Sequence, residues 1–274
     1  MSANLAQRFV EAGGYRTAYV EAGVGDAVVC IHSANPGSTG ALEYRHNLEP
    51  LSKRFRVIAP DLIGAGRTEP PTASMPNMHD AYVAHMFAFL DALGITSAHL
   101  IGNSRGALIC ISMAAEHPAR VGRMILLGNA GGGLEPAFEQ QSRAAFANFR
   151  PDRESLRAWL GGTYFSLERS VPPDVFDAYL EGSIRECEAW RPLGGLRMDV
   201  PDLRPALTSI QVPVLFVFGK EDKRWPPLPR ALEVFVNTPG SRFYVLSECG
   251  HHPQSEHPDE FNLLATHFLR GDLA

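Results

Sequence analysis

The sequence predicts an α/β fold, with a mostly parallel, doubly wound sheet and a helical lid inserted between two core strands. Three observations predict it. Short apolar runs alternate with longer helical patterns along the chain. The runs are apolar on successive residues, as strands buried on both faces of a parallel sheet require. Elsewhere, strand, helix and strand alternate, which is typical of doubly wound sheets. One long stretch contains no strand-like run, and it is the candidate for the lid.

The elements follow in order along the chain. The opening segment FVEAGGYRTAYVEAG predicts a hairpin that turns at Gly13-Gly14. Helical patterns at Met78–Leu93 and Arg105–Glu116 lie between strand-like runs. The predicted strands are Ala27–His32, Arg56–Pro60, Ala98–Asn103, Met124–Gly128, Val212–Gly219 and Phe243–Ser247.

Residues 131–207 interrupt this alternation. They contain helical patterns, many aromatic residues and several prolines, but no strand-like run. We interpret residues 131–207 as a helical lid, and residues 1–130 and 208–274 as the core into which it is inserted. A lid supplies apolar pocket walls and excludes water from the chemistry beneath it. Most of its aromatic residues are expected simply to pack the lid onto the core.

Composition limits the classes of function. The chain has 274 residues and a net charge of −5, which argues against nucleic acid or an anionic membrane as a partner. Its four cysteines form no CxxC pair and its histidines have no metal-ligand spacing, so we expect reduced thiols and no metal. No GxGxxG or P-loop is present, so no nucleotide cofactor is expected. Without a signal-peptide pattern or a bilayer-spanning apolar run, we expect a cytoplasmic protein.

The motif Gly102-Asn103-Ser104-Arg105-Gly106 is the decisive one. It follows a predicted strand and opens a predicted helix, which is the context of a GxSxG nucleophile elbow. Because the chain turns sharply there, side chains at the two glycine positions would clash, and Ser104 is expected to be strained. The backbone N–H of Arg105, at the start of the helix, is expected to point at a developing oxyanion.

A serine nucleophile needs a base and an orienting acid, in the chain order Ser, Asp, His for this arrangement. Asp222 and His251 both follow strand-like runs, where open α/β sheets gather ligand-facing residues. Glu221 competes with Asp222 for the role of acid. His252 competes with His251 for the role of base, and we favour His251 because it directly follows Gly250.

The first core strand runs into the segment His32-Ser33-Ala34-Asn35-Pro36-Gly37. A second oxyanion donor is expected from a loop at this place, and the backbone N–H of Ala34 is the candidate. The alternative is an ordinary turn from strand to loop.

Taken together, the motifs resemble the α/β-hydrolase superfamily across essentially the whole chain. A narrower resemblance is to its meta-cleavage product hydrolases, which cleave a C–C bond in 2-hydroxy-6-oxo-dienoates formed from ring-opened catechols. The segment HSANPGSTGALEYRHN is similar to HGxGPGxxGxxNxxxN, and GNSRG to GNSxGG. Likewise, FGKEDKRWPP is similar to GRDDRxxP, and CGHHPQSEHPDEFN to CGHWxQxEHxxEFN.

The resemblance implies roles for particular residues. Ser104, Asp222 and His251 match the family's catalytic triad, and Ala34 and Arg105 match its oxyanion donors. Asn103 matches a polar residue that helps to hold the substrate. The further candidates for substrate contact are Asn35, Glu43, His252, Tyr179, Arg185 and Arg191.

Some positions depart from the family pattern. Glu43 stands where the family usually has Asn, His252 where it usually has Trp, and Ala107 where it has a second Gly. The family's lid arginine, which pairs with the dienoate carboxylate, falls near Tyr179. The nearby basic candidates are Arg185 and Arg191.

The resemblance implies C–C bond hydrolysis of a small-molecule 2-hydroxy-6-oxo-dienoate without a cofactor, and a homo-oligomer as a possible assembly. The alternative is a carboxylesterase or lactonase, which uses the same triad and needs no carboxylate clamp. A slow-turnover binding module is a third class, which no feature favours. Haloalkane dehalogenation is disfavoured, because that chemistry uses Asp at the position of Ser104.

Overall fold

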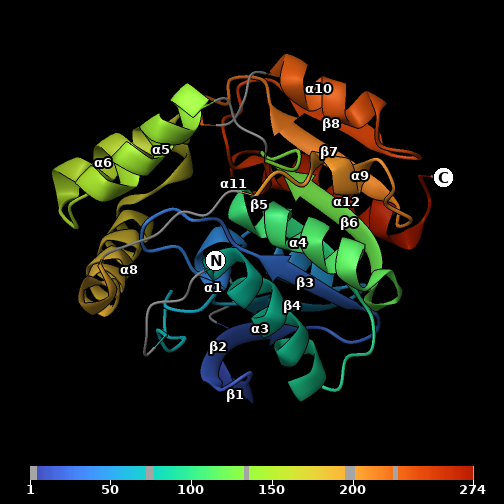
Figure 1. The fold of residues 1–274 in the computed structure, drawn as a ribbon, viewed down its shortest axis with the longest axis horizontal. Helices are drawn as coiled ribbons and strands as arrows, with labels where there is room; N and C mark the ends of the chain where they lie inside the picture. Colours follow the sequence, from blue (N-terminus) through green and yellow to red (C-terminus); the bar gives the residue numbers. More distant parts are fainter. Residues whose placement is uncertain (1–4, 72–76, 133–135, 195–200, 225–227, 274) are drawn as a thin grey trace.

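The computed structural model describes residues 5–71, 77–132, 136–194, 201–224 and 228–273. Within them, eight strands form one sheet. They are β1 (Arg8–Ala12), β2 (Tyr15–Ala22), β3 (Ala27–Ile31), β4 (Arg56–Pro60), β5 (Ala98–Asn103), β6 (Val121–Leu127), β7 (Val214–Gly219) and β8 (Arg242–Leu246). Their order in the sheet is β1-β2-β4-β3-β5-β6-β7-β8 (Figure 1).

The sheet is mostly parallel. Strands β3 to β8 run parallel, whereas β2 pairs antiparallel with both β1 and β4. β1 and β2 form the predicted hairpin, with Ala12 opposite Tyr15 and with positive φ at both Gly13 and Gly14. The doubly wound α/β fold predicted from the sequence is confirmed.

One expectation about the strands is wrong. The run at Phe243–Ser247 was expected to be buried on both faces, but Tyr244 and Val245 are 36% and 38% exposed. The reason is topological, because β8 is the outer strand of the sheet and has a neighbouring strand on one side only. An apolar run predicts a strand, but it does not predict the place of that strand in the sheet.

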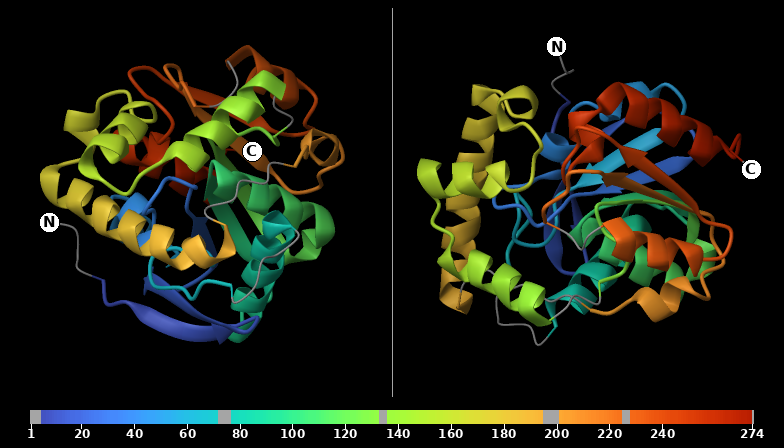
Figure 2. Two further views of the ribbon diagram at one scale, coloured as in Figure 1. Left: turned by 60° about the vertical axis from the view of Figure 1, so that its left-hand side comes forward. Right: turned by 90° about the horizontal axis from the view of Figure 1, so that it is seen from above.

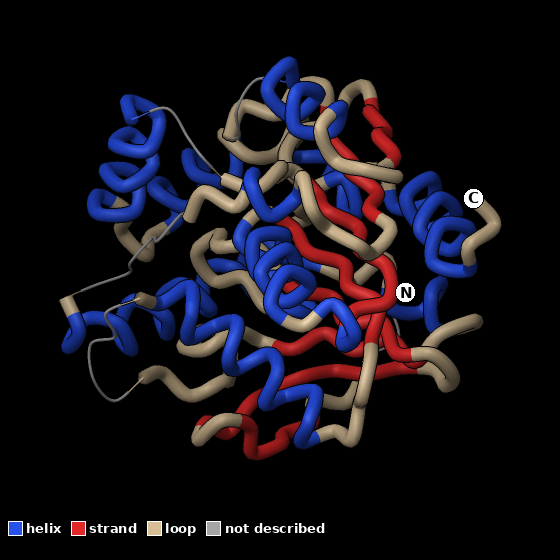
Figure 3. The backbone as a smooth tube through the Cα atoms, turned by 45° about the vertical axis from the view of Figure 1, so that its right-hand side comes forward, coloured by secondary structure: helices blue, strands red, loops and turns tan. Residues whose placement is uncertain are grey.

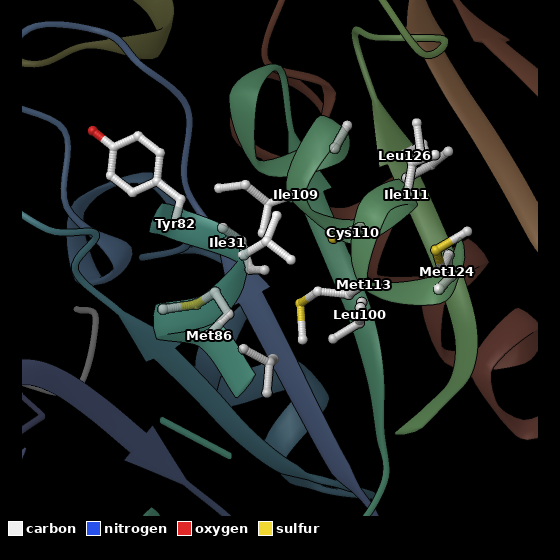
Figure 4. Packing of buried hydrophobic residues seen from close by; sticks show 14 of the residues in the cluster. Ile31, Tyr82, Met86, Leu100, Ile109, Cys110, Ile111, Met113, Met124 and Leu126 are labelled. Carbon is white, nitrogen blue, oxygen red and sulfur yellow. The ribbon is translucent and has the colours of Figure 1, made fainter. Parts of the chain in front are cut away.

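Helices cover both faces of the sheet (Figure 3). α3 (Met78–Ala92), α4 (Arg105–Glu116) and α10 (Leu228–Val236) contribute to one apolar cluster. α1 (Gly40–Glu43), α2 (Leu48–Ser52) and α12 (Pro258–Arg270) contribute to the cluster on the opposite face. Figure 4 shows Ile109 and Met113 of α4 packed beside Ile31 and Leu100 of the sheet. This packing fixes the start of α4 above β5.

The segment between β6 and β7 is helical. It contains α5 (Pro136–Asn148), α6 (Arg153–Gly161), α7 (Leu167–Ser170), α8 (Pro173–Trp190) and α9 (Arg204–Leu207). None of the described residues between 131 and 207 lies in a strand. α5, α6 and α8 lie to one side of the core, apart from the helices on the sheet faces (Figures 1 and 2). The predicted lid limits stay a prediction, since residues 133–135 and 195–200 lie outside the described part.

The parallel strands bring their carboxyl ends to one edge of the sheet. Ile31 of β3 pairs with Gly102 of β5, and Asn103 pairs with Leu127 of β6. The loops that follow these strands, and the loop after β7, therefore meet above this edge. α11 (Pro253–Glu256) follows the loop after β8. In the described part of the chain, no helix is both long enough and apolar enough to cross a bilayer.

Candidate active site

Ser104 stands at the tip of a sharp turn between β5 and α4. Its φ of 54° and ψ of −109° are strained for a residue with a side chain, at a cost of roughly 1–3 kcal/mol. A Cβ atom on Gly102 would lie 2.4 Å from the backbone of Gly106, and one on Gly106 would lie 2.1 Å from the carbonyl oxygen of Ile31. The turn therefore accepts only glycine at both positions, as the elbow motif predicts.

Asp222 and His251 form a buried pair. The Nδ1 atom of His251 lies 2.7 Å from Oδ2 of Asp222, and the two side chains are 4% and 6% exposed. Because a carboxylate only accepts, Nδ1 donates to it, and Nε2 is the ring nitrogen left for proton transfer. The competing acid, Glu221, is used differently, since its Oε2 accepts the backbone N–H of Cys249 at 3.1 Å.

The loop of His251 is held from both the lid and the elbow. The backbone N–H of His251 donates to the carbonyl of Thr163 at 2.7 Å. Its carbonyl accepts from Nδ2 of Asn103 at 2.9 Å. Asn103 was expected to contact substrate, but its amide nitrogen holds this loop and also donates to Leu127. Its Oδ1 is buried without a hydrogen-bond partner among the described residues, which leaves that atom for a ligand.

Ala34 lies on the loop after β3, next to the elbow. Gly106 of α4 approaches the backbone of Ile31 and His32 closely, which brings this loop to the start of the helix. The backbone N–H groups of Ser33 and Asn35 are both paired, whereas that of Ala34 makes no hydrogen bond to a described residue. An N–H group without a partner at this place is the donor that an oxyanion requires.

Glu43 is buried beneath the same loop, with 1% of its surface exposed. Its Oε2 accepts the backbone N–H of Ser33 at 2.9 Å, and its Oε1 accepts the hydroxyls of Ser33 and of Ser38, the latter at 2.6 Å. Burial raises the pKa of its carboxyl, while these hydrogen bonds and the charge of His251 act in the opposite direction. Both oxygens are occupied by the loop that carries Ala34, so Glu43 holds this loop from beneath.

A chain of hydrogen bonds joins the lid, the oxyanion loop and His252. Nε1 of Trp159 donates to Oδ1 of Asn35 at 2.9 Å, and Nδ2 of Asn35 lies 2.8 Å from Nε2 of His252. An indole N–H can only donate, so it orients the Asn35 amide and makes Nε2 of His252 the acceptor. The ring of His252 stacks on Tyr164 at 4.6 Å between centroids.

His252 is therefore a poor competitor for the role of base. Its burial, followed by the charge of His251, lowers its pKa well below the usual range. The ring is neutral, with its Nε2 lone pair engaged by Asn35. The structure thus favours His251, whose Nε2 is free to accept a proton, and gives His252 the part of holding the loop.

The lid candidates for substrate contact are scattered. Tyr179 is fully buried, and its hydroxyl lies 3.2 Å from that of Tyr164. Arg185 is exposed and lines an outer groove of about 530 Å³ with Asp61. Arg191 is exposed and lines a hollow of about 460 Å³ with Phe149. Neither hollow is lined by Ser104, Asp222 or His251, so the structure does not bring these arginines to the elbow.

Two charged residues that the sequence analysis did not single out lie close to the site. The backbone N–H of Arg224 donates to Oδ1 of Asp222 at 2.8 Å. Glu186 of α8 accepts the backbone N–H of Gly37 at 2.8 Å, and burial raises its pKa to about 7. The only signal for Arg224 is its position two residues after Asp222. Glu186 gives no signal, because its contact depends on how the lid packs.

The remaining polar groups do not suggest a metal centre. Among the described residues, no group of three or more His, Cys, Asp or Glu side chains could hold a metal ion. The four cysteines are free thiols, of which Cys30, Cys110 and Cys249 are buried. Burial raises the pKa of each of these three thiols, so they are protonated and unreactive.

Comparison with known proteins agrees with this geometry. The family model described as the alpha/beta hydrolase fold matches residues 27–258. The chain belongs to the α/β-hydrolase fold family. This hydrolase is 32% identical over 263 residues to 2-hydroxy-6-oxo-6-phenylhexa-2,4-dienoate hydrolase of Burkholderia cepacia, covering 91% of this chain and 89% of that protein.

Two further proteins extend the comparison. The hydrolase is 28% identical over 254 residues to a 2-hydroxy-6-oxononadienedioate/2-hydroxy-6-oxononatrienedioate hydrolase of Pseudomonas putida, covering 89% of this chain and 88% of that protein. A mutant meta-cleavage product hydrolase from Pseudomonas fluorescens, solved with acetates, is 27% identical with a TM-score of 0.83 over 98% of each chain. The resemblance to meta-cleavage product hydrolases predicted from the sequence is confirmed.

Proposed function

We propose that this hydrolase cleaves a C–C bond in 2-hydroxy-6-oxo-dienoates, the ring-fission products of aromatic degradation, with Ser104, Asp222 and His251 as its triad. The observation that carries the proposal is the buried Asp222–His251 pair, 2.7 Å apart, whose histidine loop is held by Asn103, the neighbour of the strained Ser104. The relatives named for such substrates support the choice of substrate class.

The first step is a proton shift. His251, oriented by Asp222, moves a proton from the 2-hydroxyl of the dienol to C5, which converts the dienol into a ketone. The Nε2 atom of His251 serves because Nδ1 is held by the carboxylate. The shift makes C5 a saturated CH2 carbon between the C3–C4 double bond and the C6 ketone, which prepares the C5–C6 bond for cleavage.

The second step is attack on the C6 carbonyl. Ser104, or a water that it positions, adds to C6 while Nε2 of His251 takes the proton. The N–H groups of Ala34 and Arg105 hold the oxyanion, and each such donor contributes on the order of 10²–10³ in rate. The electrons of the C5–C6 bond then pass to the 2-oxygen, which takes the proton. A 2-hydroxydienoate leaves. Where water attacked, the other product is the carboxylic acid itself; where Ser104 attacked, it is an acyl–Ser104 ester, which water then hydrolyses to the acid.

A carboxylesterase or lactonase is the second candidate. It needs the same triad and oxyanion donors but no carboxylate clamp. One observation favours it, namely that neither lid arginine, Arg185 or Arg191, lines a hollow shared with the triad. The proposal also has the enzyme act on a small molecule in the cytoplasm. The homo-oligomer that the family resemblance implies is tested by light scattering of the pure protein.

A spectrophotometric panel tests the proposal. The purified enzyme is mixed with several 2-hydroxy-6-oxo-dienoates and, in parallel, with short p-nitrophenyl esters and small lactones. Bleaching of a dienoate chromophore with kcat/KM far above that for any ester is the expected result. Ester or lactone turnover without dienoate cleavage would overturn it in favour of the second candidate.

A further inference from the structure

Arg224 sits between the acid of the triad and the lid. Its backbone N–H donates to Oδ1 of Asp222 at 2.8 Å, which fixes the main chain beside the triad. Its guanidinium lies over the ring of Trp159, with Cζ 4.0 Å from the ring centroid. Trp159 in turn donates its indole N–H to Asn35, the neighbour of Ala34. The guanidinium is therefore held between the acid loop and the oxyanion loop.

The charge of Arg224 is poorly neutralised. Its Nε is buried without a hydrogen-bond partner, and one weak bond of 3.5 Å joins Nη2 to the carbonyl of Trp159. No carboxylate among the described residues forms an ion pair with the guanidinium. The acid that acts on its charge is Asp222, whose oxygens already accept from His251 and from the Arg224 backbone. A half-buried guanidinium with a free N–H fork is suited to bind a carboxylate in two parallel hydrogen bonds.

The other arginines considered for the site are held by neighbouring groups or line separate hollows. Arg45 donates to the carbonyls of Leu42 and Ser170 at 2.8 and 2.7 Å. Arg105 lies against Tyr82, with Cζ 5.4 Å from the ring centroid. The exposed Arg185 and Arg191 line separate hollows. Arg224 differs from these arginines, because its backbone is bonded to the acid of the triad and its guanidinium forms no ion pair with a described residue.

We propose that Arg224 binds a carboxylate of the substrate, so that the loop after β7, rather than the lid, supplies the cation that selects anionic substrates. The identity of the substrate in this inference rests on the proposed function. The presence of a carboxylate subsite at Arg224 does not. The face of the Trp159 ring holds the guanidinium, and Asp222 holds its main chain. Arg224 is thus a specificity-determining residue placed by the lid and by the triad together.

The test is the Arg224→Gln variant, which keeps the backbone N–H to Asp222 and removes the charge. KM for a 2-hydroxy-6-oxo-dienoate should rise roughly 10- to 100-fold, as expected for the loss of a charge-assisted hydrogen bond. The turnover of neutral p-nitrophenyl acetate should stay near that of the wild type. The matched control is Arg157→Gln, which removes an exposed guanidinium that also lies over an aromatic ring, at 5.4 Å from Phe176.

Two substrates identify which carboxylate is bound. A mono-acid with a neutral tail carries only the dienoate carboxylate, whereas a nonadienedioate also carries one on its tail. If the substitution raises KM for both substrates, Arg224 binds the dienoate carboxylate. If it raises KM for the nonadienedioate alone, Arg224 binds the carboxylate on the tail. An equal loss on p-nitrophenyl acetate would show that Arg224 only packs the lid. The proposal would also be overturned if KM for every acid were unchanged in Arg224→Gln, or if KM rose in Arg191→Gln instead.

A separate measurement distinguishes failure of this inference from failure of the proposed function. Sorbate is a dienoate acid without the bond to be cleaved, and its competitive inhibition of p-nitrophenyl acetate hydrolysis needs no C–C chemistry. If the wild type cleaves no dienoate, the proposed function fails. Sorbate inhibition that is present in the wild type and at least tenfold weaker in Arg224→Gln would still establish the subsite, on the scale of about 1.4 kcal/mol per tenfold. Equal inhibition of both proteins would refute it.

Discussion

Replacement of Glu43 by Ala should disturb the proposed oxyanion donor, the N–H of Ala34, without touching the proposed triad. The carboxylate receives three hydrogen bonds from Ser33 and Ser38 under the loop that carries Ala34. After truncation the two hydroxyls can turn to new acceptors, but the N–H of Ser33 is left buried and unpaired. One such group costs roughly 1–3 kcal/mol, and the cavity left by the carboxyl adds to it, so we expect a loss of stability of about 2–4 kcal/mol.

The same change should lower kcat more than it affects KM. A loosened loop misplaces the N–H of Ala34, and loss of one oxyanion donor costs at most on the order of 10²–10³ in rate. We therefore expect kcat for a p-nitrophenyl ester to fall by roughly 10- to 1000-fold. Glu43→Gln retains one acceptor oxygen and should lie between Glu43→Ala and the wild type.

Urea denaturation measures the stability and initial rates measure kcat. Asp61→Ala is the matched control, because Asp61 is also buried and accepts two backbone N–H groups, from Gly40 and Arg67. It should lose similar stability but keep its kcat. A folded Glu43→Ala variant with the kcat of the wild type would refute the reasoning, and so would equal losses of kcat in both variants.

The remaining predictions concern the triad, the elbow and one buried acid. Ser104→Ala should lower kcat by at least ~10³, measured on any substrate that the wild type turns over. Gly106→Ala puts a Cβ 2.1 Å from a carbonyl oxygen and should unfold at lower urea, whereas Gly161→Ala meets nothing within 4 Å and should not. Burial raises the pKa of Asp61 to about 6. Its protonated form therefore stabilises the fold below about pH 4, and this contribution, of at most about 3 kcal/mol, should vanish as the pH rises through 6 and be absent in Asp61→Asn.

Much of the fold was predictable because its signals are local. Strands β3 to β7 are apolar on successive residues, since both of their faces are covered, and this pattern needs no knowledge of the neighbours. The elbow was predictable for the same reason, because two glycines and a serine within five residues define its backbone. The exposure of β8 was not, because the position of a strand in the sheet is a property of the whole topology.

The site was predictable only in part. The pairing of Asp222 with His251 follows from their strand ends, and the structure brings them together. The substrate-binding residues did not follow in this way, because position in a motif does not show what a side chain contacts. Arg185 and Arg191 were chosen for their charge and place in the lid, yet helix rotation turns them to other hollows. The role proposed for Arg224 depends on its contact with Trp159, which forms only when the lid packs onto the core.

One departure from the family pattern, His252, belongs to a network that reaches the lid. His252 stands where the family usually has Trp, and it fits because Nδ2 of Asn35 donates to its Nε2. That donor is available because the indole of Trp159 holds the other end of the amide, and the same indole carries the guanidinium of Arg224 on its face. A lid residue therefore fixes both a histidine beside the base and a cation beside the acid. Because each member orients the next, the position of the lid determines the polar environment of the site as well as its access to water.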